Sequence, residues 1–193
     1  AMFNIEDPEA LQAIDAYTGR QITAISQTTR EAVRGIVRRA FESGMPIIQQ
    51  IEEIAKLVGL TPLQSESLAR FRQGLVEAGE KPGRVQELVE QRAQAVRRQR
   101  AEVIARTEGM AAVHTGSYER LMQSEREGVL DGDRIRRRWL TAQDERTCPQ
   151  CAPVPGMNQQ GVGLKSYFTT PMGNTLYPPL HPNCRCTTTI SIL

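Results

Sequence analysis

The chain has 193 residues, of which 39% are hydrophobic and 24% are charged, as in an ordinary globular protein. Its aromatic content of 5% is too low for the core of a large β-sandwich, so a helical protein fits better. The net charge of +2 does not by itself indicate a nucleic-acid-binding protein. No apolar run approaches the ~20 residues that a membrane span requires, and we therefore expect no membrane contact.

The first part of the chain predicts a series of helices that are separated by glycine and proline. An Asp-Pro pair, typical of a helix start, opens a short helix over residues 7–17. Apolar residues at three- and four-residue steps predict an amphipathic helix over 22–44 and a shorter one over 47–58. A Thr-Pro start predicts a helix over 62–78, with a buried stripe formed by Leu68, Phe71 and Leu75.

A longer helix is expected from Arg84, because neither proline nor glycine interrupts the pattern before Gly109. Apolar residues recur along it every seven positions and predict a narrow seam for a helix partner, formed by Val89, Val96, Val103 and Met110. Gly109, Gly116 and Gly128 are expected to loosen its continuation before a turn at 131–133.

Arginine is far more common than lysine, and it favours bidentate contacts with phosphate or carboxylate. Arg30, Arg34 and Arg38 form a row along the predicted helix 22–44, which is either a solvated face or a contact with DNA or an acidic partner. Arg97 and Arg98 are further candidates for such a contact. At ~3.6 residues per turn, however, the arginines of the long helix do not share one face.

The character of the sequence changes after residue 130. Residues 135–141 and the threonine-rich segment 187–192 predict strands, and the loop between them is rich in Gly, Pro and Asn. We therefore expect an α+β protein in which a mostly helical N-terminal two thirds precedes a small β module. The expected divisions are an N-terminal helical segment (1–60), a helical core that includes the long helix (61–130) and a zinc-binding β module (131–193).

The β module contains a pattern of metal ligands. Cys148 and Cys151 are separated by two residues, and His181 and Cys184 repeat this spacing, so each pair can point inward from one tight turn. Three thiolates and one imidazole are a typical ligand set for Zn²⁺, with Cys186 as an alternative to Cys184. A module of this size has too little core to fold unaided, so zinc would supply part of its stability. Two arginines beside the ligands, Arg146 and Arg185, are expected to offset the negative charge of the site.

Two disulfides are the alternative, because all four cysteines of the chain lie in this module. Residues 1–10 contain acids and a proline and do not read as a secretory signal, so a reducing compartment and a metal are favoured. The zinc is expected to be structural, because four or five protein ligands can fill its coordination shell. A nucleobase deaminase would need a His-x-Glu motif, which His114 does not provide, and an HNH nuclease would need more than two histidines.

Four blocks, in this order, resemble the phage Mu F-like minor head proteins, also called phage head morphogenesis proteins. They are Leu60-Thr61-Pro62, Ile104-Ala105-Arg106-Thr107-Glu108, the run from Trp139 through Asp144-Glu145-Arg146-Thr147-Cys148-Pro149-Gln150-Cys151, and Pro178-Pro179-Leu180-His181-Pro182-Asn183-Cys184-Arg185-Cys186. The likeness covers about residues 60 to 190, and its last two blocks are the specific ones. Gly109 stands where family members more often carry threonine.

The resemblance implies a virion protein of the head interior, near the portal, that passes through the host cytoplasm during assembly. It implies contacts with the portal protein, with the major capsid or scaffolding protein, and with packaged double-stranded DNA without sequence preference. Such a protein would act in head assembly or in DNA ejection.

Two other functions remain open at this stage. The arginines allow a nucleic-acid-binding zinc module in its own right. Glu125-Arg126-Glu127 echoes the paired glutamates of ADP-ribosyltransferases, although such short patterns also arise from ordinary helix ion pairs. Glu102 and Arg106 are one expected pair of that ordinary kind.

Overall fold

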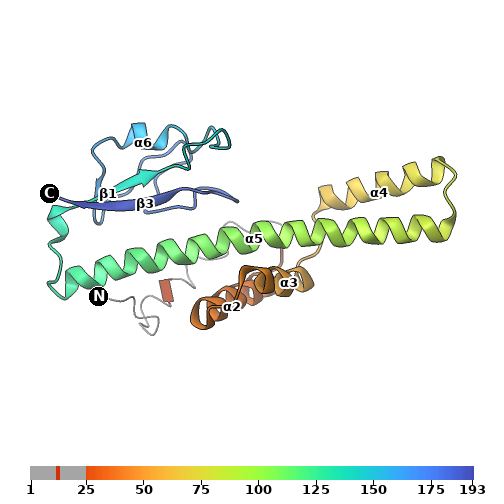
Figure 1. Ribbon diagram of the computed structural model, residues 1–193, viewed down its shortest axis with the longest axis horizontal. Coiled ribbons are helices and arrows are strands. Elements are labelled where there is room, and N and C mark those ends of the chain that lie inside the picture. Colours follow the sequence, from red (N-terminus) through yellow and green to blue (C-terminus); the bar gives the residue numbers. More distant parts are fainter. Residues whose placement is uncertain (1–11, 14–24) are drawn as a thin grey trace.

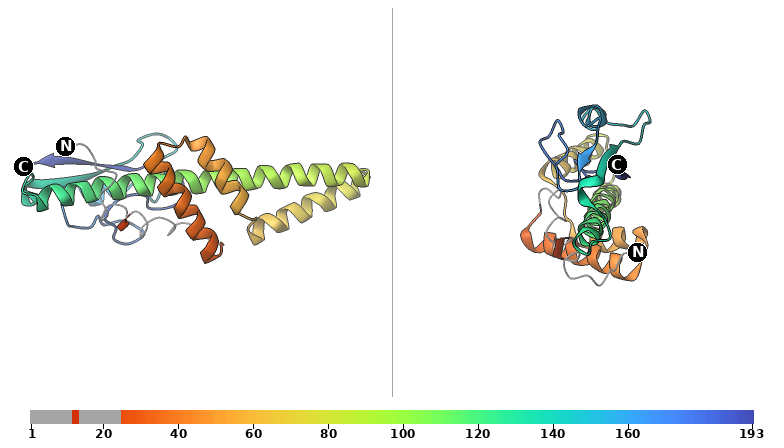
Figure 2. Two further views of the ribbon diagram at one scale, coloured as in Figure 1. Left: turned by 90° about the horizontal axis from the view of Figure 1, so that it is seen from below. Right: turned by 90° about the vertical axis from the view of Figure 1, so that its left-hand side faces the viewer.

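The computed structural model describes residues 12–13 and 25–193. The long helix α5 (Pro82–Arg126) is its axis, and the other elements pack along it (Figure 1). Helices α2 (Gln27–Ser43) and α3 (Ile47–Leu57) lie on one side of its middle, and a small sheet covers its C-terminal half on the opposite side (Figures 1 and 2). Helix α4 (Pro62–Glu77) runs back along its N-terminal half.

The ends of the first helices follow the signals in the sequence. Helix α2 begins after Ser26, whose side chain accepts a hydrogen bond from the backbone N–H of Thr29, and ends at Gly44 in the left-handed conformation with φ 68°. The predicted helix at 47–58 is confirmed as α3. The predicted helix at 7–17 and the expected start at residue 22 lie outside the described residues, apart from residues 12–13, which are helical.

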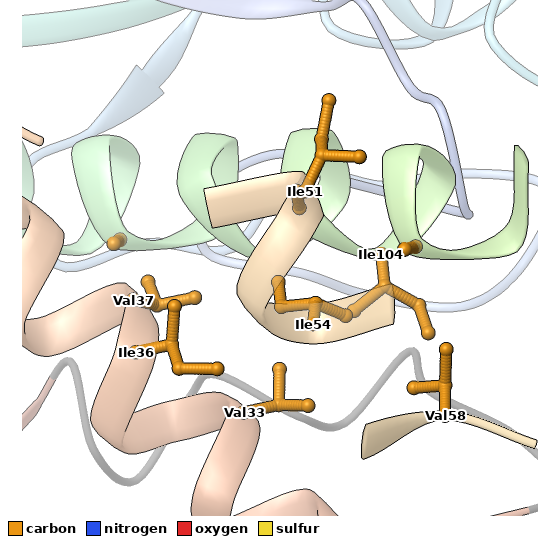
Figure 3. Close-up of a cluster of buried hydrophobic side chains, with 10 residues drawn as sticks. Val33, Ile36, Val37, Ile51, Ile54, Val58 and Ile104 are labelled. Carbon is orange, nitrogen blue, oxygen red and sulfur yellow. The ribbon is translucent and has the colours of Figure 1, made fainter. Parts of the chain in front are cut away.

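A core of aliphatic side chains joins α2 and α3 to the middle of α5 (Figure 3). Val33 and Ile54 are fully buried in it, and Ile104 enters it from α5. The other α5 residues in this core are alanines, whose small side chains let the two shorter helices approach closely. The complete set of buried residues is Val33, Ile36, Val37, Ile51, Ile54, Val58, Ala101, Ile104, Ala105 and Ala112.

Helix α5 runs without a break for 45 residues, so the expected loosening at Gly109 and Gly116 is wrong. It starts at Pro82, two residues before the expected start at Arg84, and it ends before Gly128, which has φ 69°. A glycine inside a helix costs only about 1 kcal/mol, and packing on both sides of α5 outweighs this cost.

The four residues of the predicted heptad seam are only half-buried. The buried positions of α5 lie beside that seam, and they include Ala101, Ala105 and Ala112. A seam of one residue in seven assumes a single partner helix. Helix α5 instead contacts α4 on one side, α2 and α3 on another, and the sheet on a third.

Helix α4 has the predicted bounds but not the predicted burial. Thr61 caps it, and a reciprocal hydrogen bond from its backbone N–H to the side chain of Gln64 completes a capping box. No residue of α4 is fully buried, and its apolar stripe Leu68, Phe71 and Leu75 is half-buried. This hairpin of α4 and α5 is one layer of two helices, and among the described elements no third one packs over it (Figure 1).

The sheet has three antiparallel strands in the order β2-β1-β3. The predicted strands are confirmed as β1 (Ile135–Leu140) and β3 (Thr187–Ile192), which pair with Ile135 opposite Ile192. The turn expected at 131–133 lies at the 3-10 turn η1 (Gly132–Arg134), whereas the short elements β2 (Val162–Gly163) and α6 (Val154–Met157) were not predicted. The fold is thus α+β as expected, and the divisions at 60 and 130 stay predictions.

Strand β1 places a buried arginine at the centre of the sheet module. Alternation along the strand puts Arg137 on the inner face, where it is 2% exposed. Its guanidinium donates hydrogen bonds to the carbonyl oxygens of Gly163, Ser166 and Leu176. It also lies 5.0 Å from the ring centre of Tyr118 on α5. This cation therefore joins the loops of the module to each other and to the long helix.

Candidate metal centre

The structure brings the two halves of the predicted ligand set together. His181 Nε2 lies 3.0 Å from Cys148 Sγ and 3.1 Å from Cys151 Sγ. Cys151 Sγ lies 3.8 Å from Cys184 Sγ. Cys148 and His181 are 33 positions apart in the sequence, so the chain between the two motifs forms a closed loop that starts and ends at this cluster.

Two matching turns position these side chains, as the repeated spacing predicts. The backbone N–H of Cys151 donates to the carbonyl of Cys148 at 3.1 Å, and the N–H of Cys184 donates to the carbonyl of His181 at the same distance. The second turn passes through Asn183, which has φ 58°. Asparagine tolerates this left-handed conformation better than most residues do.

His181 has the ring orientation of a metal ligand. Its Nδ1–H donates to the carbonyl oxygen of Pro182 at 2.8 Å, so the lone pair of Nε2 points at the two sulfurs. Metal-bound histidines commonly use such a backbone hydrogen bond to fix the ring. All four cysteines are free thiols, and each of them belongs to at least one group of three possible metal ligands.

The dimensions of the cluster fit a single ion. A tetrahedral zinc with bonds of about 2.3 Å to sulfur and about 2.0 Å to nitrogen separates neighbouring ligand atoms by roughly 3.5–3.8 Å. The sulfurs of Cys151 and Cys184 have this separation, and the histidine nitrogen would move away from its two sulfurs by about half an ångström. A cavity of about 30 Å³ lies among Cys148, Cys151, His181 and Cys186. That volume suits one ion.

The thiols of the cluster differ in their pKa values. A hydrogen bond from the Cys186 side chain, helped by backbone N–H groups, lowers the pKa of Cys184 to about 5 despite its burial. Burial raises the pKa of Cys151 to about 12, and the neighbouring Cys184 raises the pKa of Cys186. The pKa of Cys148 is lowered despite its desolvation, because of hydrogen bonds from Cys151 and Gln150, so the cluster favours thiolates at some positions and thiols at others. A divalent cation would compensate further thiolates and release their protons.

Cys186 and Cys184 both remain within reach of the cluster. One possible ligand group is formed by Cys148, Cys151 and His181, and the second by Cys151, Cys184 and Cys186. Cys151 therefore belongs to both groups.

A carboxylate that the sequence analysis did not single out lies beside the cluster. Arg185 donates two hydrogen bonds of 2.7 Å to Asp144, one to each carboxylate oxygen. The backbone N–H of Arg146 donates to the same carboxylate at 3.1 Å. The side-chain hydrogen bond from Arg185 lowers the pKa of Asp144. Both arginines line the cluster cavity, and they also tie the two ligand motifs together through Asp144.

Two polar residues of α5 hold the second ligand motif, and the sequence analysis assigned neither of them this role. Thr107 Oγ1 accepts a hydrogen bond of 3.0 Å from the backbone N–H of Asn183 and donates one of 2.7 Å to the carbonyl of Val103. His114 Nε2–H donates to the carbonyl of Cys186 at 3.2 Å. Both side chains are buried, and desolvation lowers the pKa of His114. In the sequence, these two residues are marked only as polar residues at helix positions that have apolar neighbours.

The family model described as Phage Mu protein F like protein matches residues 31–189. The chain belongs to this family. The match includes most of α2, all of α3, α4 and α5, and the complete cysteine–histidine cluster, so it reaches further toward the N-terminus than the motif resemblance did. No curated protein and no solved structure shows significant similarity to the chain.

The Mu F-like family consists of phage head morphogenesis proteins. As a member of this family, the chain is a phage head morphogenesis protein. In the described part of this Mu F-like protein, no helix has both the length and the apolarity needed to cross a membrane.

The arginines proposed for DNA contact differ in their exposure and in their neighbours in this Mu F-like protein. Arg30, Arg34 and Arg38 are half-buried along α2, and Arg38 forms an ion pair of 3.1 Å with Glu42. On α5, Arg97 is half-buried and Arg98 is exposed. Arg98 lines a groove of about 570 Å³ between α3 and α5.

The acidic residues that suggested an enzyme take part in ordinary contacts. Glu102 and Arg106 form the expected ion pair, at 2.7 Å. Glu125 forms an ion pair of 2.8 Å with Lys165 in the β module, and Glu127 accepts a hydrogen bond from Gln123. These contacts dock the module on α5 and cap the end of the helix.

Proposed function

We propose that this Mu F-like protein is a structural component of the phage head that works beside the portal, and that Zn²⁺ holds its C-terminal module in one fixed position on α5. The observation that supports this most directly is the attachment of the cluster to the long helix. Thr107 and His114 each bind backbone atoms next to a candidate ligand. A folded cluster is therefore needed to align these two contacts.

The metal in this proposal is structural. Its ligands would be Cys148, Cys151, His181 and Cys184, with Cys186 as the alternative to Cys184. Four such donors fill a tetrahedral shell and leave no position for a substrate. Cys184 is preferred to Cys186 because it shares a tight turn with His181 and its sulfur lies 3.8 Å from Cys151 Sγ, the separation expected of two sulfur ligands on one zinc ion. When bound, zinc would supply a cross-link between two turns 30 residues apart.

A head protein with this role should bind the portal protein and remain in the mature particle. We expect the purified chain to capture the portal protein that is encoded in the same phage genome, and we expect the chain in purified virions by mass spectrometry. Contacts with the major capsid or scaffolding protein belong to the same proposal. Absence from virions together with failure to bind portal would overturn it.

Contact with packaged DNA is the second part of the proposal, and Arg98 supports it. This exposed arginine shares a groove with Lys56, although Glu52 lies in the same groove. If several phosphates are neutralised, the logarithm of the affinity for duplex DNA should fall with the logarithm of salt concentration, with a slope of about −0.9 per phosphate.

The DNA test needs two matched variants. Lys56→Gln combined with Arg98→Gln should reduce the magnitude of the salt slope by about 2. Arg84→Gln, an exposed arginine on the same helix that already pairs with Glu87, is the control and should change the slope less. No binding at low salt would remove DNA contact from the proposed function and leave the portal role standing.

A further inference from the structure

Strand β3 forms one edge of the sheet, and half of its backbone groups face away from β1. The N–H of Leu193 donates to the carbonyl of Arg134 at 2.9 Å, which makes Leu193 and Arg134 a hydrogen-bonded pair. In an antiparallel ladder such pairs alternate with non-hydrogen-bonded ones. The register therefore turns the N–H and C=O groups of Thr188, Ile190 and Ile192 outward, away from β1.

This edge lacks the features by which folded proteins prevent strand addition. Exposed edges are commonly protected by lysine, proline or a bulge, whereas Thr187–Ile192 contains no charge, no proline and an unbroken register of six pairs. Ile190 and Ile192 are 43% and 62% exposed. Thr188 and Ile190 border a groove of about 530 Å³ between the sheet and α5, and its apolar wall includes Leu121 and Val129.

We propose that this edge pairs with the same edge of a second copy of the chain, in antiparallel orientation about a two-fold axis. The pairing that satisfies the outward groups places Ile190 opposite Ile190 and Thr188 opposite Ile192 of the other copy. Two identical edges can meet in this way because neither carries charge, so no like charges come face to face. The two sheets would join into one of six strands.

The positive charges nearest to the axis do not oppose this pairing. Arg136 and Arg138 lie on β1, one strand away from the edge. Across the dimer they would be separated from their counterparts by three strand spacings, or about 14 Å, which exceeds the screening length of about 8 Å at physiological salt. Because a single strand pair buries little area, the association should be weak and concentration-dependent. This inference does not depend on the metal or on the role in the phage head.

The test measures the self-association of the full, metal-bound chain by sedimentation velocity, at concentrations up to about 1 mM. We expect a monomer–dimer equilibrium. Amide hydrogen exchange supplies a second measurement on the unaltered protein, in which the amides of Thr188, Ile190 and Ile192 should become protected as concentration rises. The amide of Thr189, which faces β1, should be protected at every concentration.

Ile190→Pro is the decisive variant, because it removes an outward N–H and leaves the bonds to β1 intact. It should abolish the dimer with unchanged zinc content. Ile190→Lys is a second variant with the same expected result, and Leu63→Lys, on α4 and 75% exposed, is the control that should still dimerise. Three results would each overturn the proposal. They are a chain that is monomeric at all concentrations, a dimer that survives both substitutions at Ile190, and edge amides that become protected only when another protein is added.

Discussion

Thr107 and His114 lie two turns apart on one face of α5, and each binds the backbone of the segment that carries the last candidate ligands. The contacts join residues that are 76 and 72 positions apart in the sequence. The geometry of the cluster is therefore set partly by a helix that contributes no ligand to it.

Removing these contacts should loosen the module without removing a ligand. Thr107→Val leaves the N–H of Asn183 without its acceptor, which should cost about 1–3 kcal/mol of unfolding free energy. Chemical denaturation with metal bound would measure this. Val113→Ala, at a position 45% exposed on the same helix, is the control and should cost less. Equal losses in the two variants would contradict a specific role for Thr107.

Loss of a metal ligand should unfold the C-terminal module first. Cys148→Ser or His181→Ala is expected to lower the zinc content measured by mass spectrometry and to expose Trp139, which is 3% accessible in the folded chain. The helical circular dichroism signal should largely remain, because α2, α3 and α5 have their own core. Full zinc content in both variants would contradict the assignment.

The choice between the last two cysteines can be tested in the same way. Cys184→Ser should lower zinc affinity far more than Cys186→Ser, because Cys184 shares a tight turn with His181 and its sulfur lies 3.8 Å from Cys151 Sγ, as two ligands of one zinc ion would. Competition with a chelator gives both affinities. The reverse order would make Cys186 the fourth ligand.

The ion pair between Asp144 and Arg185 should make stability fall in acid. The pKa of Asp144 is lowered in the folded chain, so the pair contributes fully above the unfolded value of about 3.9 and is lost as pH falls through the folded pKa. Asp144→Asn should destabilise the chain at neutral pH and flatten this acid dependence. Thermal unfolding of the metal-free protein at a series of pH values separates the effect from metal release. Identical pH profiles for parent and variant would contradict it.

Gly109 should tolerate a side chain. A Cβ added to Gly109 meets no atom within 4 Å, and the residue lies inside a continuous helix. Gly109→Ala should therefore raise the unfolding free energy by about 0.5–1 kcal/mol. Gly128→Ala, at φ 69°, should lower it. Thermal unfolding of the two variants would show these opposite shifts.

The sequence predicts best those features that local chemistry decides. The Thr61 cap, the end of α2 at Gly44 and the alternation of β1 follow from side chains within a few residues. The two Cys/His spacings predicted the cluster because each turn is local and only the closure between them is long-range.

What the sequence did not predict depends on distant partners. The uninterrupted path of α5 through Gly109 is stabilised by elements on several sides, none of which is visible in its own periodicity. Strand β2 is two residues long and exists only because β1 offers it a partner. The roles of Thr107, His114 and Asp144 follow from contacts across more than 40 positions, which no local pattern records.

The unbroken course of α5 gives the molecule a fixed length. At about 1.5 Å per residue, its 45 residues span roughly 68 Å. The C-terminal end of α5, from which the chain continues into the sheet, and the tip of the α4–α5 hairpin are thus held at the two ends of a stiff rod. In an assembled particle, the components bound at these two ends would be kept at a fixed distance from each other. A displacement of one end would be transmitted to the other end with little loss.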